Sequence, residues 1–147
     1  MLNGQGGPGN PYWDDTYNGA GSTTTNLAPL SGGLGQLTDG IIPTENFNLV
    51  EPNGPYVAWE YGAEPGFDPT ITFHFAGTVR IDALTVHVDD SNGAWGVHTP
   101  AGVTIAMGGT SRYYAIADPP GSAPFGALFS DLGLTGSSLS LTIDNAG

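Results

Sequence analysis

The sequence predicts an all-β fold, an antiparallel β-sandwich in which two sheets pack face to face. Apolar and polar residues alternate repeatedly between Thr70 and Val103, as expected for strands that bury one face. The chain also contains 24 glycines and 12 prolines, which favour tight turns and disfavour long helices. No segment keeps a period of 3.6 residues over three turns. Together these observations favour a binding or assembly protein whose loops carry the function.

The predicted strands follow one another from the middle of the chain to its end. Ile71, Phe73 and Phe75 define one alternating run, and a phase slip at Ala83–Leu84 predicts a bulge or bend. The segment 126–129 is too short to assign. The expected strands lie near Tyr56–Tyr61, Thr70–Phe75, Val79–Val88, Val103–Met107, Arg112–Ala117 and Ser138–Ile143.

The first 26 residues are rich in Gly, Asn and Thr and poor in apolar side chains. They predict an extended, glycine-rich N-terminal arm in front of a domain at residues 27–147. Tyr12, Trp13 and Tyr17 are the expected anchors of this arm. They would hold it either on its own domain or on a neighbouring subunit, and the sequence leaves both possibilities open.

The composition excludes several classes of function. Fourteen carboxylates face only two cationic side chains, Arg80 and Arg112, and the net charge is −12. Nucleic acids and anionic membranes need cations at the contact, so neither is expected as a partner. The absence of cysteine excludes disulfides and thiolate chemistry. No apolar run reaches the roughly 20 residues that span a bilayer, and the first ten residues contain no recognisable signal peptide.

Five short motifs occur in order along the chain. They are Leu37-Thr38-Asp39-Gly40, then Trp59, then Ile71-Thr72-Phe73-His74-Phe75, then Ile81-Asp82-Ala83-Leu84-Thr85-Val86-His87-Val88, then Gly96-Val97-His98-Thr99-Pro100. Over residues 27–144 this series resembles the galactose-binding-like, discoidin-type family, whose members are similar to coagulation factor 5/8 C-domains. The resemblance implies an eight-stranded jelly-roll sandwich. It also implies binding of glycans, lipids or proteins through loops at one end, and rarely catalysis.

The resemblance further implies a structural Ca²⁺ ion near the first motif. Asp39 is then the expected side-chain ligand, with backbone carbonyls around Leu37 and Gly40, because oxygen ligands suit a hard cation. Members of the family usually close with a strand whose acidic residue reaches the same ion, and this sequence stops at Gly147 before such a strand. We therefore expect an incomplete Ca²⁺ site and an open sheet edge, which the arm, a neighbour's arm or nothing would fill.

The loop from Asp89 to Gly96 contains the main candidates for ligand binding. Trp95 lies among glycines, with Asp89 and Asp90 before it and His98 after it. An aromatic plane beside carboxylates suits a sugar ring, which stacks on the indole and donates its hydroxyls. The same residues would also serve a protein interface, or Trp95 would fold back over the core, and the three interpretations stay open. For the aspartates, a turn held by side-chain to backbone hydrogen bonds is favoured over a metal site.

No catalytic set is apparent, so we expect a protein that is not an enzyme. The chain lacks a nucleophile elbow, a phosphate-binding loop and any lysine. The favoured hypothesis is an outer decoration (cement) subunit of a virion or similar surface array, which contacts other subunits as a homo-oligomer or in a capsid lattice. The alternative is a carbohydrate-binding module of a larger secreted or cell-surface protein. Both hypotheses place the protein on a virion or at an extracellular surface.

Overall fold

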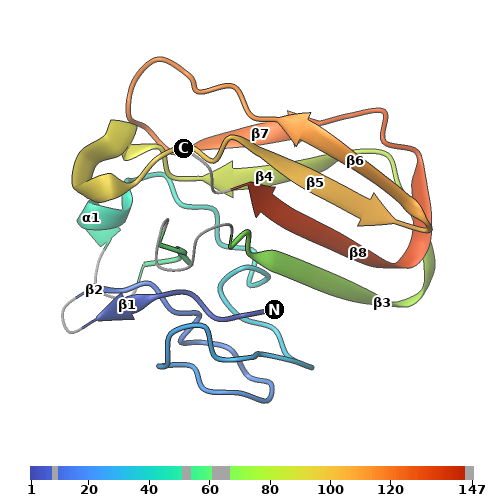
Figure 1. Ribbon diagram of the computed structural model, residues 1–147, viewed down its shortest axis with the longest axis horizontal. Helices are drawn as coiled ribbons and strands as arrows, with labels where there is room; N and C mark the ends of the chain where they lie inside the picture. Colours follow the sequence, from blue (N-terminus) through green and yellow to red (C-terminus); the bar gives the residue numbers. More distant parts are fainter. Residues whose placement is uncertain (8–9, 51–53, 61–66, 145–147) are drawn as a thin grey trace.

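The computed structural model describes residues 1–7, 10–50, 54–60 and 67–144 (Figure 1). Besides a short N-terminal ribbon of two strands, these residues form two antiparallel sheets that make up the sandwich. One sheet has four strands and the other has two, which confirms the predicted all-β class. The four-stranded sheet has the order β3 (Thr70–Ile81), β8 (Leu134–Asp144), β5 (Gly102–Met107) and β6 (Thr110–Ala115). The two-stranded sheet pairs β4 (Leu84–Val88) with β7 (Phe125–Phe129).

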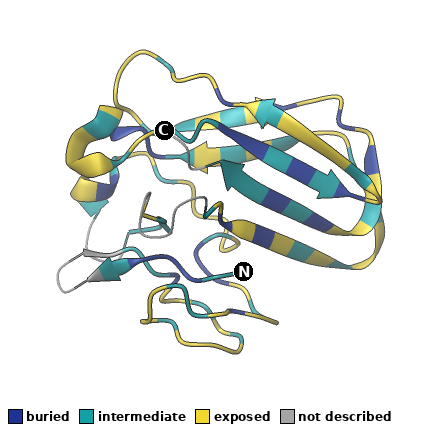
Figure 2. Cartoon of the chain, viewed as in Figure 1, coloured by how far each residue is buried: buried dark blue, intermediate teal, exposed yellow. Residues whose placement is uncertain are grey.

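The hydrophobic core lies between these two sheets. Val103 and Ile105 on β5 are fully buried, and every second residue turns inward along β5 from Val103 and along β8 from Leu139 to Leu141 (Figure 2). Fully burying one such side chain stabilises the fold by about 1.5–3 kcal/mol. The two-stranded sheet contributes Val86 and Phe129 to the same core. The alternation in the sequence therefore corresponds to one apolar layer shared by both sheets.

Strand β3 corrects one predicted boundary. The sequence predicts separate strands at Thr70–Phe75 and Val79–Val88, whereas one strand continues from Thr70 to Ile81. Its pairing with β8 shifts between His74 and Val79, so the interruption is a bulge inside the strand.

The phase slip at Ala83–Leu84 is a bend, as predicted. The chain leaves the four-stranded sheet at Ile81 and enters the two-stranded sheet at Leu84. Ile81 and Leu84 are an odd number of residues apart, yet both pack against the core because they belong to different sheets. The backbone oxygen of Asp82, at the bend, accepts a hydrogen bond from the amide of Leu132 at 3.0 Å.

Other predicted elements differ from the structure. Residues 56–60 form no strand, because only single hydrogen bonds join them to the N-terminal loops, and Tyr61 lies outside the described residues. The strand expected at Arg112–Ala117 begins and ends two residues earlier. The strand expected at Ser138–Ile143 is longer, and β7 occupies the segment that the sequence leaves unassigned. Two short helical segments occur, α1 (Phe47–Val50) and the 3₁₀ turn η1 (Ser91–Gly96).

The N-terminal residues fold against residues 27–50 and 54–60, and no extended arm is seen in the part of the chain that the structure describes. The amide of Leu30 donates to the oxygen of Met1 at 2.8 Å, and the amide of Asn3 donates to the oxygen of Ala28 at 2.9 Å. A two-residue ribbon joins β1 (Gly6–Gly7) to β2 (Asn10–Pro11). These loops lie beside the sandwich (Figure 1). The division into an arm and a domain at residue 27 stays a prediction.

Candidate functional site

The most exposed large apolar side chain in the described residues is Trp95, which is 85% exposed. It lies in η1, beside α1 at one end of the sandwich (Figure 1). Ser91, Asn92 and Trp95 all have positive φ angles, of 41°, 48° and 59°. Non-glycine residues in sparsely populated backbone conformations cost on the order of 1–3 kcal/mol each, and such strain gathers at functional sites. Because the Trp95 side chain is so exposed, it does not fold back over the core, and one of the three interpretations of this residue is removed.

Asp89 fixes the base of this loop. Its carboxylate accepts hydrogen bonds from the Phe47 amide at 2.8 Å, from Asn46 Nδ2 at 2.7 Å and from Ser91 Oγ at 3.0 Å. The Phe47 amide is the first N–H of α1, so the carboxylate satisfies a donor that the helix itself leaves unpaired. Asn46 Nδ2 also donates to the Ser122 backbone oxygen. The side chain of Asn46, directly before α1, thus joins this helix to η1 and to the loop before β7.

Asp90 is also buried rather than presented to solvent. It is 1% exposed, and its Oδ1 accepts from the Asn92 amide and from Thr99 Oγ1, both at 3.2 Å. Its Oδ2 has no hydrogen-bond partner. The two aspartates form the predicted turn with side-chain to backbone hydrogen bonds, and they support the loop from beneath.

His98 belongs to the same loop cluster. It is exposed, and a side chain on Gly93 would lie 3.0 Å from its Cε1, so the imidazole packs against this glycine. His98 can both donate and accept a hydrogen bond beside the loop that carries Trp95. The structure thus brings Trp95, Asp89, Asp90 and His98 into one loop system, with the tryptophan and the histidine facing solvent.

The three predicted arm anchors all bind their own chain. Trp13 Nε1 donates to Asn26 Oδ1 at 2.6 Å, and the Tyr17 hydroxyl accepts from the Gly33 amide at 2.9 Å. The Tyr12 ring meets the Phe47 ring edge to face, with centroids 5.7 Å apart. Of these anchors, Tyr12 connects to the Trp95 loop, because the Phe47 amide donates to Asp89.

The predicted metal ligands lie on the N-terminal loops. Asp39 is exposed, and its Oδ1 accepts from the Ile41 amide at 2.7 Å. Leu37 is half-buried, and Gly40 turns the chain with a φ of 83°. Within the described ranges, no group of three His, Cys, Asp or Glu side chains is placed to hold a metal ion.

Two residues outside the predicted Leu37–Gly40 motif, Asp14 and Gln36, each have a side-chain oxygen that is buried without a hydrogen-bond partner. Asp14 is 1% exposed, and its Oδ1 accepts from the Gln36 amide at 2.9 Å. Asp14 Oδ2 and Gln36 Oε1 are both buried without a hydrogen-bond partner. Burial raises the pKa of Asp14, and the negative charges of Asp15 and Asp39 raise it further. The only sequence signal for this pair is that Gln36 directly precedes the Leu37–Gly40 motif.

These two unpaired oxygens fit the Ca²⁺ ion that the resemblance implies. A buried carboxylate oxygen and a buried amide oxygen are hard ligands, and both lack a donor. Gln36 Nε2 donates to Asp15 Oδ1 at 3.0 Å and to the Gly54 oxygen at 3.1 Å, so its amide oxygen is held in place. Asp39 supplies a further carboxylate whose charge acts on Asp14.

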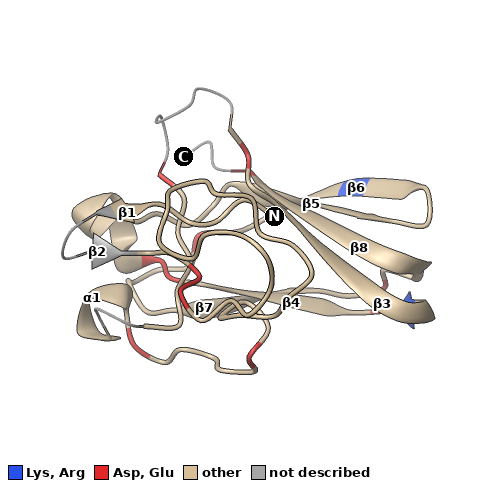
Figure 3. Ribbon diagram, turned by 90° about the horizontal axis from the view of Figure 1, so that it is seen from below, with Lys and Arg blue, Asp and Glu red and all other residues tan. Residues whose placement is uncertain are grey.

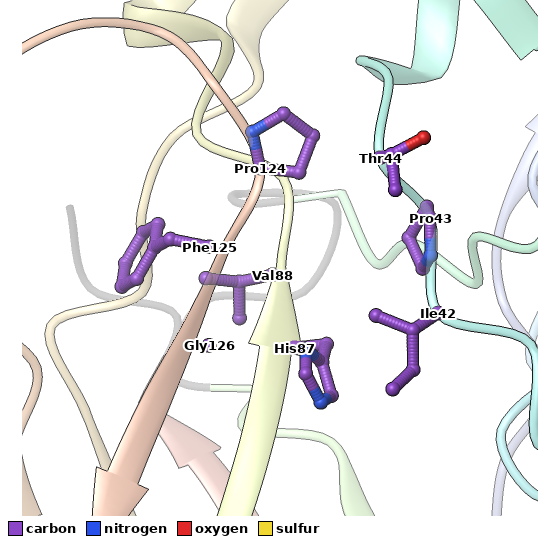
Figure 4. Close-up of a pocket in the computed structure, with 8 residues that line it drawn as sticks. All are labelled: Ile42, Pro43, Thr44, His87, Val88, Pro124, Phe125 and Gly126. Atoms are coloured by element: carbon purple, nitrogen blue, oxygen red, sulfur yellow. The ribbon is translucent and has the colours of Figure 1, made fainter.

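A shallow pocket of about 330 Å³ lies elsewhere, between residues 42–44, the end of β4 and the start of β7. Its lining is mostly apolar, with Ile42, Val88 and Phe125 among the contributors, and His87 is its single imidazole (Figure 4). The pocket thus contains no pair of converging carboxylates of the kind that hydrolytic chemistry needs.

Charge is distributed unevenly over the molecule. Arg80 and Arg112, the only two cationic side chains of the Lys and Arg type, lie on β3 and β6, away from the N-terminal loops (Figure 3). Arg80 Nη2 pairs with Asp82 Oδ1 at 2.7 Å. Most described carboxylates lie on the loops, where no lysine or arginine opposes them. The loops that carry these carboxylates therefore have a negative potential that attracts cations.

A comparison with known families gives a match that covers most of the chain. The family model of the DS-like domain of discoidin domain-containing receptors 1/2 matches residues 6–115. This confirms the discoidin-type resemblance. Domains of this kind are generally non-catalytic binding domains that are extracellular or surface-exposed. A search of curated proteins finds no match. Among the described residues, no helix has the length and apolar character to cross a membrane.

Proposed function

We propose, from the premise that this chain belongs to the family of discoidin DS-like domains, that it is a non-catalytic carbohydrate-binding module. The ligand would bind at the η1 loop, with a sugar ring stacked on Trp95. The single observation that supports this proposal is the 85% exposure of an indole on a strained loop that buried carboxylates hold in place. An aromatic side chain of this size offers a large apolar area that a ligand can cover.

The loop is suited to binding because its conformation is already fixed. Asp89 ties it to α1 and Asp90 ties it to Thr99, so ordering the loop adds little entropy cost when a ligand binds. The indole offers a flat apolar face to the C–H groups of a sugar. His98 and Asn92, both exposed in the same loop system, supply donors and acceptors for hydroxyl groups.

The test is a glycan array followed by affinity measurements on variants. Trp95→Ala should lower the affinity for any glycan hit by about 30-fold or more, the effect of losing an interaction hot spot of about 2 kcal/mol. Trp95→Phe should keep most of the affinity because it keeps an aromatic plane. Leu128→Ala is the matched control, since Leu128 is 66% exposed on β7 and should not matter. An array without hits, or equal affinity of wild type and Trp95→Ala, would refute the proposal.

The same exposed indole would also serve as an anchor in a protein interface. The role as a virion decoration subunit gains no support from the family match and stays a prediction. Sedimentation of the purified protein tests it, since a strict monomer at all concentrations would contradict a subunit that assembles through its own surfaces.

We also propose that the protein binds a structural Ca²⁺ ion through Asp14 and Gln36, with Asp39 nearby. The support is the pair of buried oxygens without a donor, Asp14 Oδ2 and Gln36 Oε1. When bound, the ion would supply positive charge to a cluster that has none of its own. The residues would then hold the N-terminal loops together, because Asp14 and Gln36 lie on separate loops. The ion has no catalytic role in this proposal.

A further inference from the structure

A second buried carboxylate without a counter-ion lies beneath the Trp95 loop. Asp90 is 1% exposed, and its Oδ2 is buried and has no hydrogen-bond partner. Leaving a buried charged oxygen without a partner is costly, because the group has lost its water and gained nothing in return. A cation beside this oxygen would supply the partner that it lacks.

The hydroxyl group of Thr99, next to Asp90, has two carboxylate acceptors and only one proton to donate. Thr99 Oγ1 lies 3.2 Å from Asp90 Oδ1 and 3.1 Å from Asp118 Oδ1. A hydroxyl has one proton, so Thr99 can donate to only one of these two carboxylates. The other carboxylate faces a lone pair on Thr99, which is repulsive unless a positive charge lies between the oxygens.

No lysine or arginine supplies such a charge to this place. The chain has no lysine, Arg80 is paired with Asp82, and Arg112 lies on β6 opposite Ile105 in the middle of a strand ladder. The loop end of the molecule is negative as a whole (Figure 3). An external cation would neutralise Asp90 and Asp118 without any lysine or arginine.

We infer that Asp90, Thr99 and Asp118 form a second cation site, which takes a hard divalent ion of the Ca²⁺ type. The three residues offer two carboxylates and a hydroxyl, all oxygen ligands of the kind that Ca²⁺ prefers. Ca²⁺ binds oxygen at 2.3–2.6 Å, so ligands on opposite sides of the ion are about 5 Å apart. Both carboxylates already contact one hydroxyl oxygen, and Asp118 is exposed and free to rotate toward the ion. Backbone carbonyls and water would complete the shell.

This site shares no residue with the pair Asp14 and Gln36. It joins the loop after η1 to the loop after β6, since Thr99 follows η1 and Asp118 follows β6. An ion here would fix the position of the loop that carries Trp95.

The number of Ca²⁺ ions bound, measured by calorimetric titration, tests the inference on the full chain. Wild type should bind two ions and Asp14→Asn one. In Asp118→Asn, the affinity of the second site should be at least tenfold weaker than in wild type. Asp131→Asn is the matched control, because Asp131 is an exposed carboxylate in the turn between β7 and β8, outside both proposed sites. Tb³⁺ as a probe adds a local readout, since a nearby tryptophan sensitises its emission.

The outcomes separate the two sites. If Asp14→Asn binds no ion while Asp131→Asn binds as wild type does, the second site is refuted and Asp90 only holds the turn. If Asp118→Asn and Thr99→Val both bind as wild type does, the site is likewise refuted. If wild type and Asp14→Asn each bind one ion and Asp118→Asn binds none, the second site stands and the first fails. None of these measurements requires a glycan, so the result is independent of the binding function at Trp95.

Discussion

Removal of Ca²⁺ should destabilise the protein through the Asp14 site. Calcium sites of extracellular modules have dissociation constants of about 10⁻⁴–10⁻³ M. A ligand that binds only the folded state stabilises it by RT ln(1 + [L]/Kd), which is about 1.4–2.7 kcal/mol at 10 mM Ca²⁺ for this range. For a chain of this length, 1 kcal/mol corresponds to about 2–4 °C in melting temperature. The Asp14 site should therefore raise the melting temperature by about 3–11 °C.

Scanning calorimetry in 10 mM Ca²⁺ and in excess EDTA measures this difference. Asp14→Asn should show a smaller Ca²⁺-dependent shift than wild type, by the amount that this site contributes. Asp131→Asn should show the wild-type shift. In EDTA, Asp14→Asn should lose less stability than wild type does when the pH rises from 4 to neutral. Burial raises the pKa of Asp14 above its ordinary 3.8, so wild-type stability falls as the pH rises from 3.8 through that raised pKa, and asparagine removes this dependence.

Two results would refute this reasoning. An unchanged melting temperature in excess EDTA would contradict a structural ion altogether. A full wild-type shift in Asp14→Asn would show that Asp14 Oδ2 and Gln36 Oε1 do not hold the ion.

Three further predictions concern the stability of the fold. Ile105→Ala should cost about 2–5 kcal/mol in chemical denaturation, because Ile105 is fully buried between the sheets. Gly4→Ala should destabilise the protein by at least about 1 kcal/mol in the same assay, since its Cβ would lie 2.0 Å from the Tyr12 backbone oxygen; a neutral effect would contradict the packing of the N-terminal loops. Burial, together with the charge of Asp89, raises the pKa of Tyr56 above 10, so stability should fall as the pH rises above 10. Tyr56→Phe should reduce this loss of stability at alkaline pH. It should also cost about 1 kcal/mol at pH 7, because the hydrogen bond to the Glu45 oxygen is lost. If the stability of wild type and variant falls equally steeply above pH 10, the prediction is wrong.

The sandwich could be predicted from the sequence because burial on one face of a strand appears directly as alternation. Ile71 and Phe73 on β3 and Val86 on β4 are examples, and the phase slip between them marks the change of sheet. Strand β7 could not be predicted, because it is only five residues long and contains Gly126 and the exposed Leu128. Residues 56–60 alternate like a strand, yet their neighbours are loops that offer only isolated hydrogen bonds. Alternation indicates which residues are buried, and it does not supply a partner strand.

The candidate sites show the same limit. The glycines around Trp95 indicate a loop, and the composition of this loop alone suggests ligand binding. The unpaired oxygens of Asp14, Gln36 and Asp90 could not be found in this way. They depend on which polar groups the folded chain leaves without a partner, and no local pattern records that.

The central claim is that a sugar binds on the face of Trp95, and the indole N–H signals of the protein test it most directly. The chain has three tryptophans, and those of Trp13 and Trp59 donate within their own chain, to Asn26 Oδ1 and to the oxygens of Leu2 and Asn3. In a two-dimensional NMR titration with a glycan from the array, the Trp95 signal, assigned with Trp95→Phe, should shift and saturate while the other two stay in place. A saturating shift confined to Trp13 or Trp59, or no indole shift at full ligand occupancy, would contradict the account.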